Sequence, residues 1–412
     1  MKYISILFLL SSIFYSCKES VDAVDKTIIP VAEVVGTGEI LNLSDYAKSV
    51  KYIPLETNDS VLVGHINYLI YENGHIILHD LQAELCRVFH EDGSYKTNLG
   101  RIGHWPGEYS YVRAMAIMPG LEGVFLSTNE GYFVYDLEGT LQKTMSRLEA
   151  PDSFFEATTV PITDEVFLSH IVAMNDLRYK ALIWGKKDTS RIYELCPANT
   201  GWDYSEELHS YIISTCKWRF GDQTRCYWPA TDTIFTIGSD LKMGKAFVID
   251  LGEYKRPLKW IIGGVFRKEL EASKTISVSN AILESSRYLF FDLHMYRLAP
   301  EAFTYKKRNI RGQMQEFKST NVYALFDKES GELTLLNQPV KYKYLGFCND
   351  LDGGPCFWPE YISAKNEMVA SWSAEDFLKI YEQLPNPSAE LKAVAEKLNQ
   401  DDNPVLMIVT LK

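Results

Sequence analysis

Short apolar segments separated by polar turns recur along most of the chain. Residues 75–80 and 85–89 flank one such turn, and the tripeptide Glu91-Asp92-Gly93 follows the second segment. The same order of apolar strand, polar turn, apolar strand and acidic residue near a glycine returns at residues 123–139 and 321–336. Hairpins joined by glycine-containing turns produce this spacing. The pattern therefore predicts a chain built mainly of β-hairpins.

Six such units lie between Ile40 and Trp372, at about 55 residues per unit. A repeat of nearly constant length is typical of arrays and propellers, and radial closure leaves few exposed strand edges. We therefore predict an all-β, six-bladed β-propeller that occupies residues 39–412. A pair of β-sandwiches is the alternative fold.

The C-terminal part of the chain has a different pattern. Residues 374–381 and 388–398 show helical periodicity, and Ser373 stands at the N-cap position of the first segment. Residues 405–411 follow as a nearly continuous apolar run, which predicts a strand buried on both faces. We expect this closing strand to complete a blade and so to close the ring.

The first residues indicate where the protein is located. Lys2 precedes an apolar run that ends at Ser16-Cys17, and the run is too short to span a bilayer. This is typical of a lipoprotein signal, so we predict a signal peptide at residues 1–16, lipidation of Cys17 and a tether at residues 17–38. The expected location is the outer membrane, on its periplasmic or cell-surface face. An ordinary secretory signal with an incidental cysteine is the alternative.

Composition narrows the function classes. The formal net charge is −12, which argues against a nucleic-acid partner because such partners require a basic surface. The chain has 25 Tyr, 20 Phe and 8 Trp, and aromatic residues favour the pleated surfaces of β-sheets. The predicted membrane contact is the lipid alone.

Seven cysteines are present, and assigning Cys17 to lipid leaves six. In an oxidising compartment an even number suggests disulfides. The pairs that lie close in sequence are Cys216 with Cys226 and Cys348 with Cys356. Small buried thiols are an equally good interpretation.

Metal-binding and catalytic motifs give little guidance. The sequence has no nucleophile elbow, zinc-protease helix or phosphate-binding loop. Asn349, Asp350 and Asp352 precede a glycine, as in the start of a calcium loop. Tyr361 stands where such a loop places its bidentate Glu, so a tight turn is favoured. We expect no cofactor, with calcium as a weak candidate.

Three segments carry a resemblance to a known family. They are residues 52–57 (YIPLET), residues 100–109 (GRIGHWPGEY), and residues 349–354 (NDLDGG) with the later residues 357–359 and 402–406. In this order they resemble the six-bladed β-propeller lipoproteins of Bacteroides-like bacteria. The resemblance implies the fold, while most members of that family have no known function. It also implies that a glycine usually occupies the position of Trp105.

The second of these segments is the best candidate for a ligand-binding site. Its candidate contact residues are Arg101, Trp105, Glu108, Tyr109 and Tyr111. Aromatic faces beside a few charges are typical of sites for glycans and peptides. Packing of these aromatic residues between blades is the alternative.

The sequence therefore favours a lipid-anchored, non-catalytic binding protein for a glycan, a peptide or a partner protein. One alternative is a glycan hydrolase or lyase with its site in the axial funnel of the propeller. Another is a structural accessory subunit of an uptake complex. The sequence does not choose a ligand.

Overall fold

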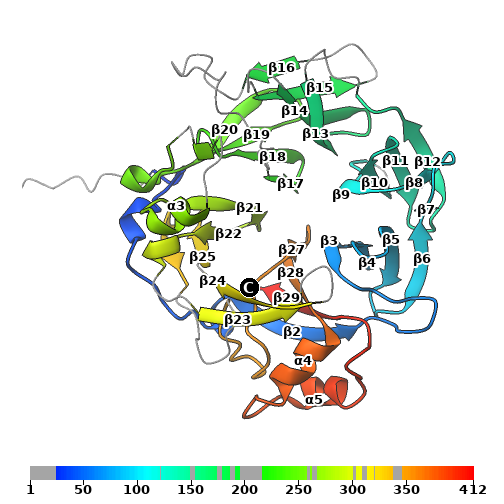
Figure 1. Cartoon of the computed structure of the whole chain (residues 1–412), viewed down its shortest axis with the longest axis vertical. Helices are drawn as coiled ribbons and strands as arrows, with labels where there is room; N and C mark the ends of the chain where they lie inside the picture. Colours follow the sequence, from blue (N-terminus) through cyan, green and yellow to red (C-terminus); the bar gives the residue numbers. More distant parts are fainter. Residues whose placement is uncertain are drawn as a thin grey trace, which may run out of the picture.

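The strands of the molecule form a ring of six blades around a central axis (Figure 1). The computed structural model describes residues 25–412 except 121, 149–153, 174–178, 186–190, 195–215, 258–259, 262–266, 300–302, 309–312, 320 and 337–345. The predicted six-bladed propeller is therefore confirmed.

Each blade is an antiparallel sheet whose first strand lies nearest the axis. Blade 1 contains β3 (Ile66–Glu72), β4 (His75–Asp80), β5 (Leu85–His90) and β6 (Tyr95–Leu99). Blade 2 contains β9 (Val112–Ile117), β10 (Gly123–Thr128), β11 (Tyr132–Asp136) and β12 (Leu141–Met145). Blade 3 contains β13 (Phe154–Pro161), β14 (Val166–Ala173), β15 (Tyr179–Gly185) and β16 (Arg191–Glu194).

The other half of the ring departs from this plan in small ways. Blade 4 contains β17 (Cys216–Phe220), β18 (Gln223–Trp228), β19 (Thr233–Ile237), β20 (Met243–Ile249) and the added β1 (Ile28–Ile29). Blade 5 contains β21 (Ser277–Glu284), β22 (Tyr288–His294), β25 (Asn321–Asp327) and β26 (Leu333–Leu335). A separate hairpin, β23 (Phe303–Arg308) and β24 (Met314–Ser319), lies between β22 and β25 in the chain.

Blade 6 joins the two ends of the domain. It contains β27 (Tyr361–Ile362), β28 (Glu367–Trp372), β29 (Val405–Leu411) and β2 (Ala47–Pro54). The C-terminal strand β29 lies between β28 and β2, and six of its seven residues are buried. The predicted closing strand is therefore confirmed, and its apolar sequence reflects its central place in the blade.

The helices of the described residues are few and short. They are α1 (Leu43–Tyr46), α3 (Arg267–Ala272), α4 (Ala374–Tyr381) and α5 (Ala389–Ala395), with 3-10 turns at Ala32–Val34, Gly252–Tyr254 and Tyr296–Leu298. Ser373 caps α4 by accepting the N–H of Asp376 at 3.2 Å, as its sequence position predicts. Both C-terminal helices lie outside blade 6 in Figure 1, and Phe377 and Leu391 pack into the core cluster that includes Tyr52.

The N-terminal segment differs from the predicted free tether. From residue 25 the chain packs along the outside of the ring, and β1 pairs in parallel with β20 of blade 4. Ile29 and Val31 are fully buried, and Glu39 bridges to Leu336 at the edge of blade 5. The domain therefore begins near residue 25 instead of 39, because these apolar residues cover an otherwise exposed strand edge.

The two predicted disulfides are absent, because Cys216, Cys226, Cys348 and Cys356 are free thiols. Cys216 stands opposite Tyr227, so the neighbouring Cys226 points to the other face of the blade. The Sγ of Cys226 lies 3.4 Å from His170 of blade 3, whereas the Sγ of Cys216 contacts Ile282 of blade 5. For the second pair, the backbone is paired at Phe347 and Phe357, but no sulfur–sulfur bond is formed.

Candidate functional site

The segment that carries Trp105 lies at the outer rim of the ring. It leaves the outermost strand of blade 1 at Leu99 and reaches the innermost strand of blade 2 at Val112. On the way it forms the short parallel pair β7 (Arg101–Ile102) and β8 (Glu108–Tyr109). Figure 1 places both strands at the circumference, between β6 and β12, away from the axis.

Tyr109 fixes the base of this loop. Its side chain is completely buried, its hydroxyl donates to the carbonyl of Leu99 at 2.7 Å, and it accepts the N–H of Cys86 at 3.1 Å. Burial raises the pKa of this hydroxyl far above its usual value, so it stays a neutral donor. The expectation that Tyr109 contacts a ligand is therefore corrected: it connects the loop to blade 1.

Glu108 holds the turn of the loop from inside. Its Oε2 accepts the N–H of Trp105 at 3.0 Å, and its Oε1 lies 2.6 Å from Nε of Arg101. The N–H of Trp105 and the guanidinium of Arg101 lower the pKa of this carboxyl. A Cβ on Gly103 would lie 1.9 Å from Oε2, so a larger residue there would displace this carboxylate. Glu108 is 7% exposed and is a scaffold residue, which corrects its predicted ligand role.

A second carboxylate secures the other side of the loop. Glu130, in the turn between β10 and β11, accepts the N–H of Ser110 at 3.0 Å through Oε2 and the hydroxyl of Ser110 through Oε1. His104 Nδ1 lies 3.5 Å from the same carboxylate. The hydroxyl of Tyr135 also donates to the carbonyl of Gly107 at 2.7 Å. The loop is therefore held by backbone groups of blade 1 and by side chains of blade 2.

The outward side of this loop carries several apolar side chains beside the exposed Arg101 and His104. Trp105 is 76% exposed, Ile102 49%, Tyr111 41% and Leu141, at the start of β12, 36%. A Cβ on Gly107 would lie 3.0 Å from Leu141, which places the tip of the loop beside β12. We call Arg101, Ile102, His104, Trp105 and Leu141 the rim surface; Tyr111 lies at the axial end of the segment, just before β9 and close to Tyr68 of β3. Packing of Trp105 between blades would require near-complete burial, so that alternative is wrong.

Sequence reasoning found part of this surface and missed the rest. The structure brings Arg101, Trp105 and Tyr111 to the outside, as predicted. Ile102 and Leu141 were missed because an isolated aliphatic residue in a strand pattern normally predicts burial. Leu141 opens the polar sequence of an outer strand, and this was the signal that could have indicated its exposure.

The calcium candidates do not form an open cation site. Both carboxylate oxygens of Asp350 bind Ser44, at 2.8 Å to its N–H and 2.6 Å to its hydroxyl. Asp352 accepts the amide of Asn349 at 2.6 Å and the N–H of Gly354 at 3.0 Å. The contacts of Asp352 are those of a tight turn, whereas those of Asp350 connect the turn to Ser44 of α1. In the described part of the chain, no group of three His, Cys, Asp or Glu side chains is placed to hold a metal.

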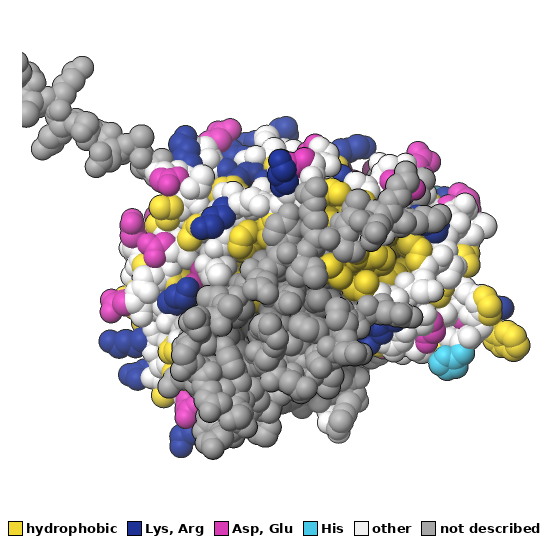
Figure 2. All heavy atoms as spheres, turned by 90° about the horizontal axis from the view of Figure 1, so that it is seen from above, with side chains coloured by type: hydrophobic (Ala, Val, Ile, Leu, Met, Phe, Trp, Pro, Cys, Tyr) yellow, Lys and Arg dark blue, Asp and Glu magenta, His cyan; other side chains and the backbone are white. Residues whose placement is uncertain are grey.

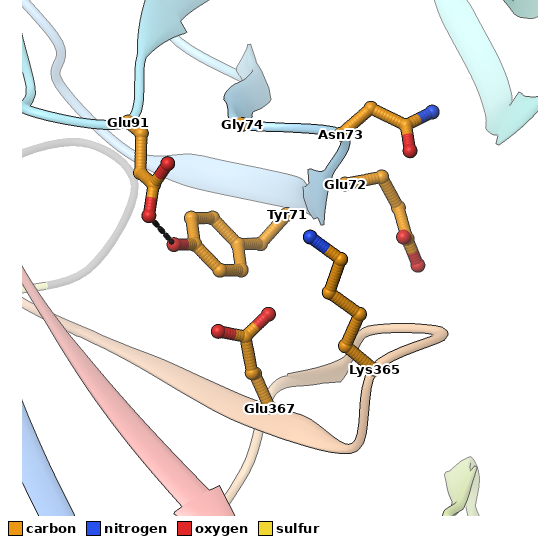
Figure 3. A pocket seen from close by; sticks show the side chains of 7 residues that line it. All are labelled: Tyr71, Glu72, Asn73, Gly74, Glu91, Lys365 and Glu367. Atoms are coloured by element: carbon orange, nitrogen blue, oxygen red, sulfur yellow. Dashed lines mark hydrogen bonds between the residues drawn. The ribbon is translucent and has the colours of Figure 1, made fainter.

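A small polar pocket opens at the seam between blades 1 and 6 (Figure 3). The hydroxyl of Tyr71 donates to Glu91 at 3.2 Å, and the amine of Lys365 points across toward the β3–β4 turn. Glu72 accepts the hydroxyl of Tyr361 at 3.0 Å and the N–H of Ala364 at 2.7 Å. These bonds join the first blade to the last, so we assign the pocket a role in ring closure.

Charges of both signs are spread over the visible surface. In the view of Figure 2, Lys and Arg side chains alternate with Asp and Glu around the described part of the molecule. Mixed charges give little long-range attraction for a polyanion. No helix in the described ranges is long and apolar enough to cross a membrane.

The fold and the rim loop together define a six-bladed propeller with a rigid, apolar projection at its circumference. More specifically, the chain belongs to the family whose model is described as "Domain of unknown function (DUF4934)", which matches residues 26–410.

One solved structure agrees with the fold. A Bacteroides fragilis protein inferred to be exported has a TM-score of 0.66 at 16% identity, covering 94% of this chain and 100% of its own. A member of the DUF4221 family from Bacteroides vulgatus has a TM-score of 0.49 at 11% identity, covering 89% and 97%. No curated protein matches the chain.

Proposed function

We propose that this protein is a lipid-anchored, cell-surface or outer-membrane binding protein whose rim surface contacts the ligand. The observation that carries the proposal is the 76% exposure of Trp105 on a loop that the buried carboxylate of Glu108 holds in place. Large aromatic side chains gain much free energy when a partner covers them, and they dominate binding energies at interfaces.

The hydrogen bonds that fix the loop support a binding role as much as its amino-acid composition does. A flexible loop would lose conformational entropy on binding, whereas a loop already fixed by Glu108, Tyr109 and Glu130 loses less. An exposed aromatic side chain on a preorganised support supports a binding role, because less entropy is lost when a partner binds.

The location of the protein is proposed from its first residues. The apolar run before Cys17 is typical of a lipoprotein signal, and the structural relative from B. fragilis is inferred to be exported. The folded domain starts near residue 25, so about eight residues separate the proposed lipid from the ring. A glycan hydrolase or lyase with an axial site, and a structural subunit of an uptake complex, stay as alternative predictions.

The test is Trp105→Ala, with Leu62→Ala as the matched control at another exposed position. We expect both variants to keep the melting temperature of the wild type, because neither position is buried. Only Trp105→Ala should weaken binding on a glycan array or to outer-membrane extracts. Wild-type binding by Trp105→Ala, or a large loss of its stability, would contradict the proposal for the rim surface.

A further inference from the structure

We infer that the occupant of the rim surface is a protein with an apolar pocket bordered by a carboxylate, and not a glycan. This inference rests on the proposed binding function and names its partner class. Three features of the surface lead to it: its aliphatic content, the state of its polar groups and its place relative to the N-terminus.

The apolar part of the surface extends beyond one aromatic ring. Ile102 lies three residues before Trp105 in the same loop, Leu141 lies beside Gly107 of that loop, and all three apolar side chains are more than a third exposed. A glycan site typically combines an aromatic face with polar side chains that bind hydroxyl groups. Aliphatic neighbours around an aromatic anchor instead form the uncharged centre that is typical of protein interfaces.

The carboxylates of the surface are partly occupied by the loop itself. Hydroxyl groups donate as well as accept, so a sugar needs acceptors in its site. Each oxygen of Glu108 and Glu130 already has one partner within the loop, which leaves less acceptor capacity for a sugar.

The polar side chains that remain outward include one cation. Arg101 is 79% exposed, and only its Nε is paired with Glu108. The rest of its guanidinium faces outward beside Ile102, so charge complementarity calls for a carboxylate at the edge of the partner's pocket.

The place of the surface favours a partner away from the anchoring membrane. The N-terminal segment packs against blade 4, and Figure 1 shows it at the left of the ring with β7 and β8 at the right. The chain from Cys17 to Asp25 spans at most about 28 Å when fully extended. Two blades on opposite sides of the ring, each four strands wide, together span about 28 Å. The space around the axis adds to this width of the ring. A ring tethered at one edge therefore presents its rim surface at the other.

The experiment uses the full-length protein in intact cells, with the photo-crosslinking residue benzoylphenylalanine at Leu141 or at Ile102. We expect a discrete adduct that proteases degrade and that high salt reduces. Adding Trp105→Ala should lower its yield at least tenfold, whereas Trp105→Phe should retain most of it. The same probe at Leu62, which is 55% exposed, should not give this adduct. Melting temperatures confirm that each variant is folded.

The possible outcomes separate the partner class from the binding function. An adduct that resists proteases but is cleaved by periodate would show a glycan, which overturns this inference and leaves the proposed function standing. A lipid adduct would also overturn it. If neither probe position gives an adduct that depends on Trp105, both the inference and the rim binding function are wrong. A protease-sensitive adduct that is insensitive to salt would refute the acidic border of the pocket.

Discussion

Asp292 offers a quantitative test of how the interior of blade 5 is arranged. It lies on β22, where its Oδ2 accepts the amide of Asn321 at 3.0 Å. Its Oδ1 is buried and makes no hydrogen bond within the described part of the chain. Burial raises the pKa of this carboxyl from 3.8 to about 7, and the bond from Asn321 only partly opposes the rise.

The sign and size of the effect follow from this pKa. Because the folded state holds the proton more tightly than the unfolded state, stability falls as pH rises between 3.8 and about 7. Ionised Asp292 then costs the folded state at most about 4 kcal/mol above pH 7. About 1.6 kcal/mol of that cost is already present at pH 5.

The perturbation is Asp292→Asn, which keeps an acceptor for Asn321 and cannot ionise. Urea unfolding should find the variant more stable than the wild type at pH 8, by about 2–4 kcal/mol. The difference should shrink by roughly 2–3 kcal/mol at pH 5. Asp327→Asn is the control of opposite sign. Burial raises the pKa of Asp327, but Arg287 and the N–H groups of Glu329 and Ser330 lower it overall. That variant should be less stable at both pH values.

Two results would refute the reasoning. If Asp292→Asn is no more stable than the wild type at pH 8, Asp292 does not carry an ionisation cost in the folded state. If the difference is present but constant from pH 5 to pH 8, the gain comes from packing and not from the proton. Both measurements require a reversible, cooperative transition, which coincident probes establish.

Three further outcomes are expected. Cys17→Ala should move the protein from the membrane to the soluble fraction, and identical fractionation of mutant and wild type would rule out the lipid anchor. Deletion of residues 404–412 removes the strand between β2 and β28, so circular dichroism and size-exclusion chromatography should find no folded monomer; a soluble, cooperatively unfolding truncation would contradict this. Tyr109→Phe should cost about 1–3 kcal/mol in thermal unfolding, because the carbonyl of Leu99 and the N–H of Cys86 lose their partner; Tyr111→Phe, at an exposed ring, is the control, and equal stabilities would refute the anchoring role.

The sequence by itself determined the class of fold, because its strongest signals come from strands buried on both faces. The middle strands β4, β5, β10, β11 and β29 are almost wholly buried, and their apolar runs indicated them clearly. Inner and outer strands were harder to recognise. β6 and β12, for example, alternate weakly and carry polar residues, since one edge of each faces outward. A local signal, Ser373 at an N-cap position, was also sufficient to predict the start of α4 from the sequence.

The tertiary structure decided which residues of the rim loop are available. Tyr109 and Tyr111 lie two positions apart in one polar, glycine-rich segment, yet one is fully buried and the other 41% exposed. The difference comes from Leu99 and Cys86 of blade 1, which bind the hydroxyl of Tyr109. No local pattern contains that contact, because it depends on how two blades meet.

The same limit applied to the cysteines and to the N-terminal segment. Cys216 and Cys226 are close in sequence, but strand pairing turns them to opposite faces of blade 4. Residues 25–38 have the composition of a linker, and yet Ile29 finds a buried place against β20, more than 200 residues away. Hydrophobic periodicity predicts whether a side chain is buried. It does not predict which surface covers that side chain, because the covering surface depends on long-range pairing in the closed ring.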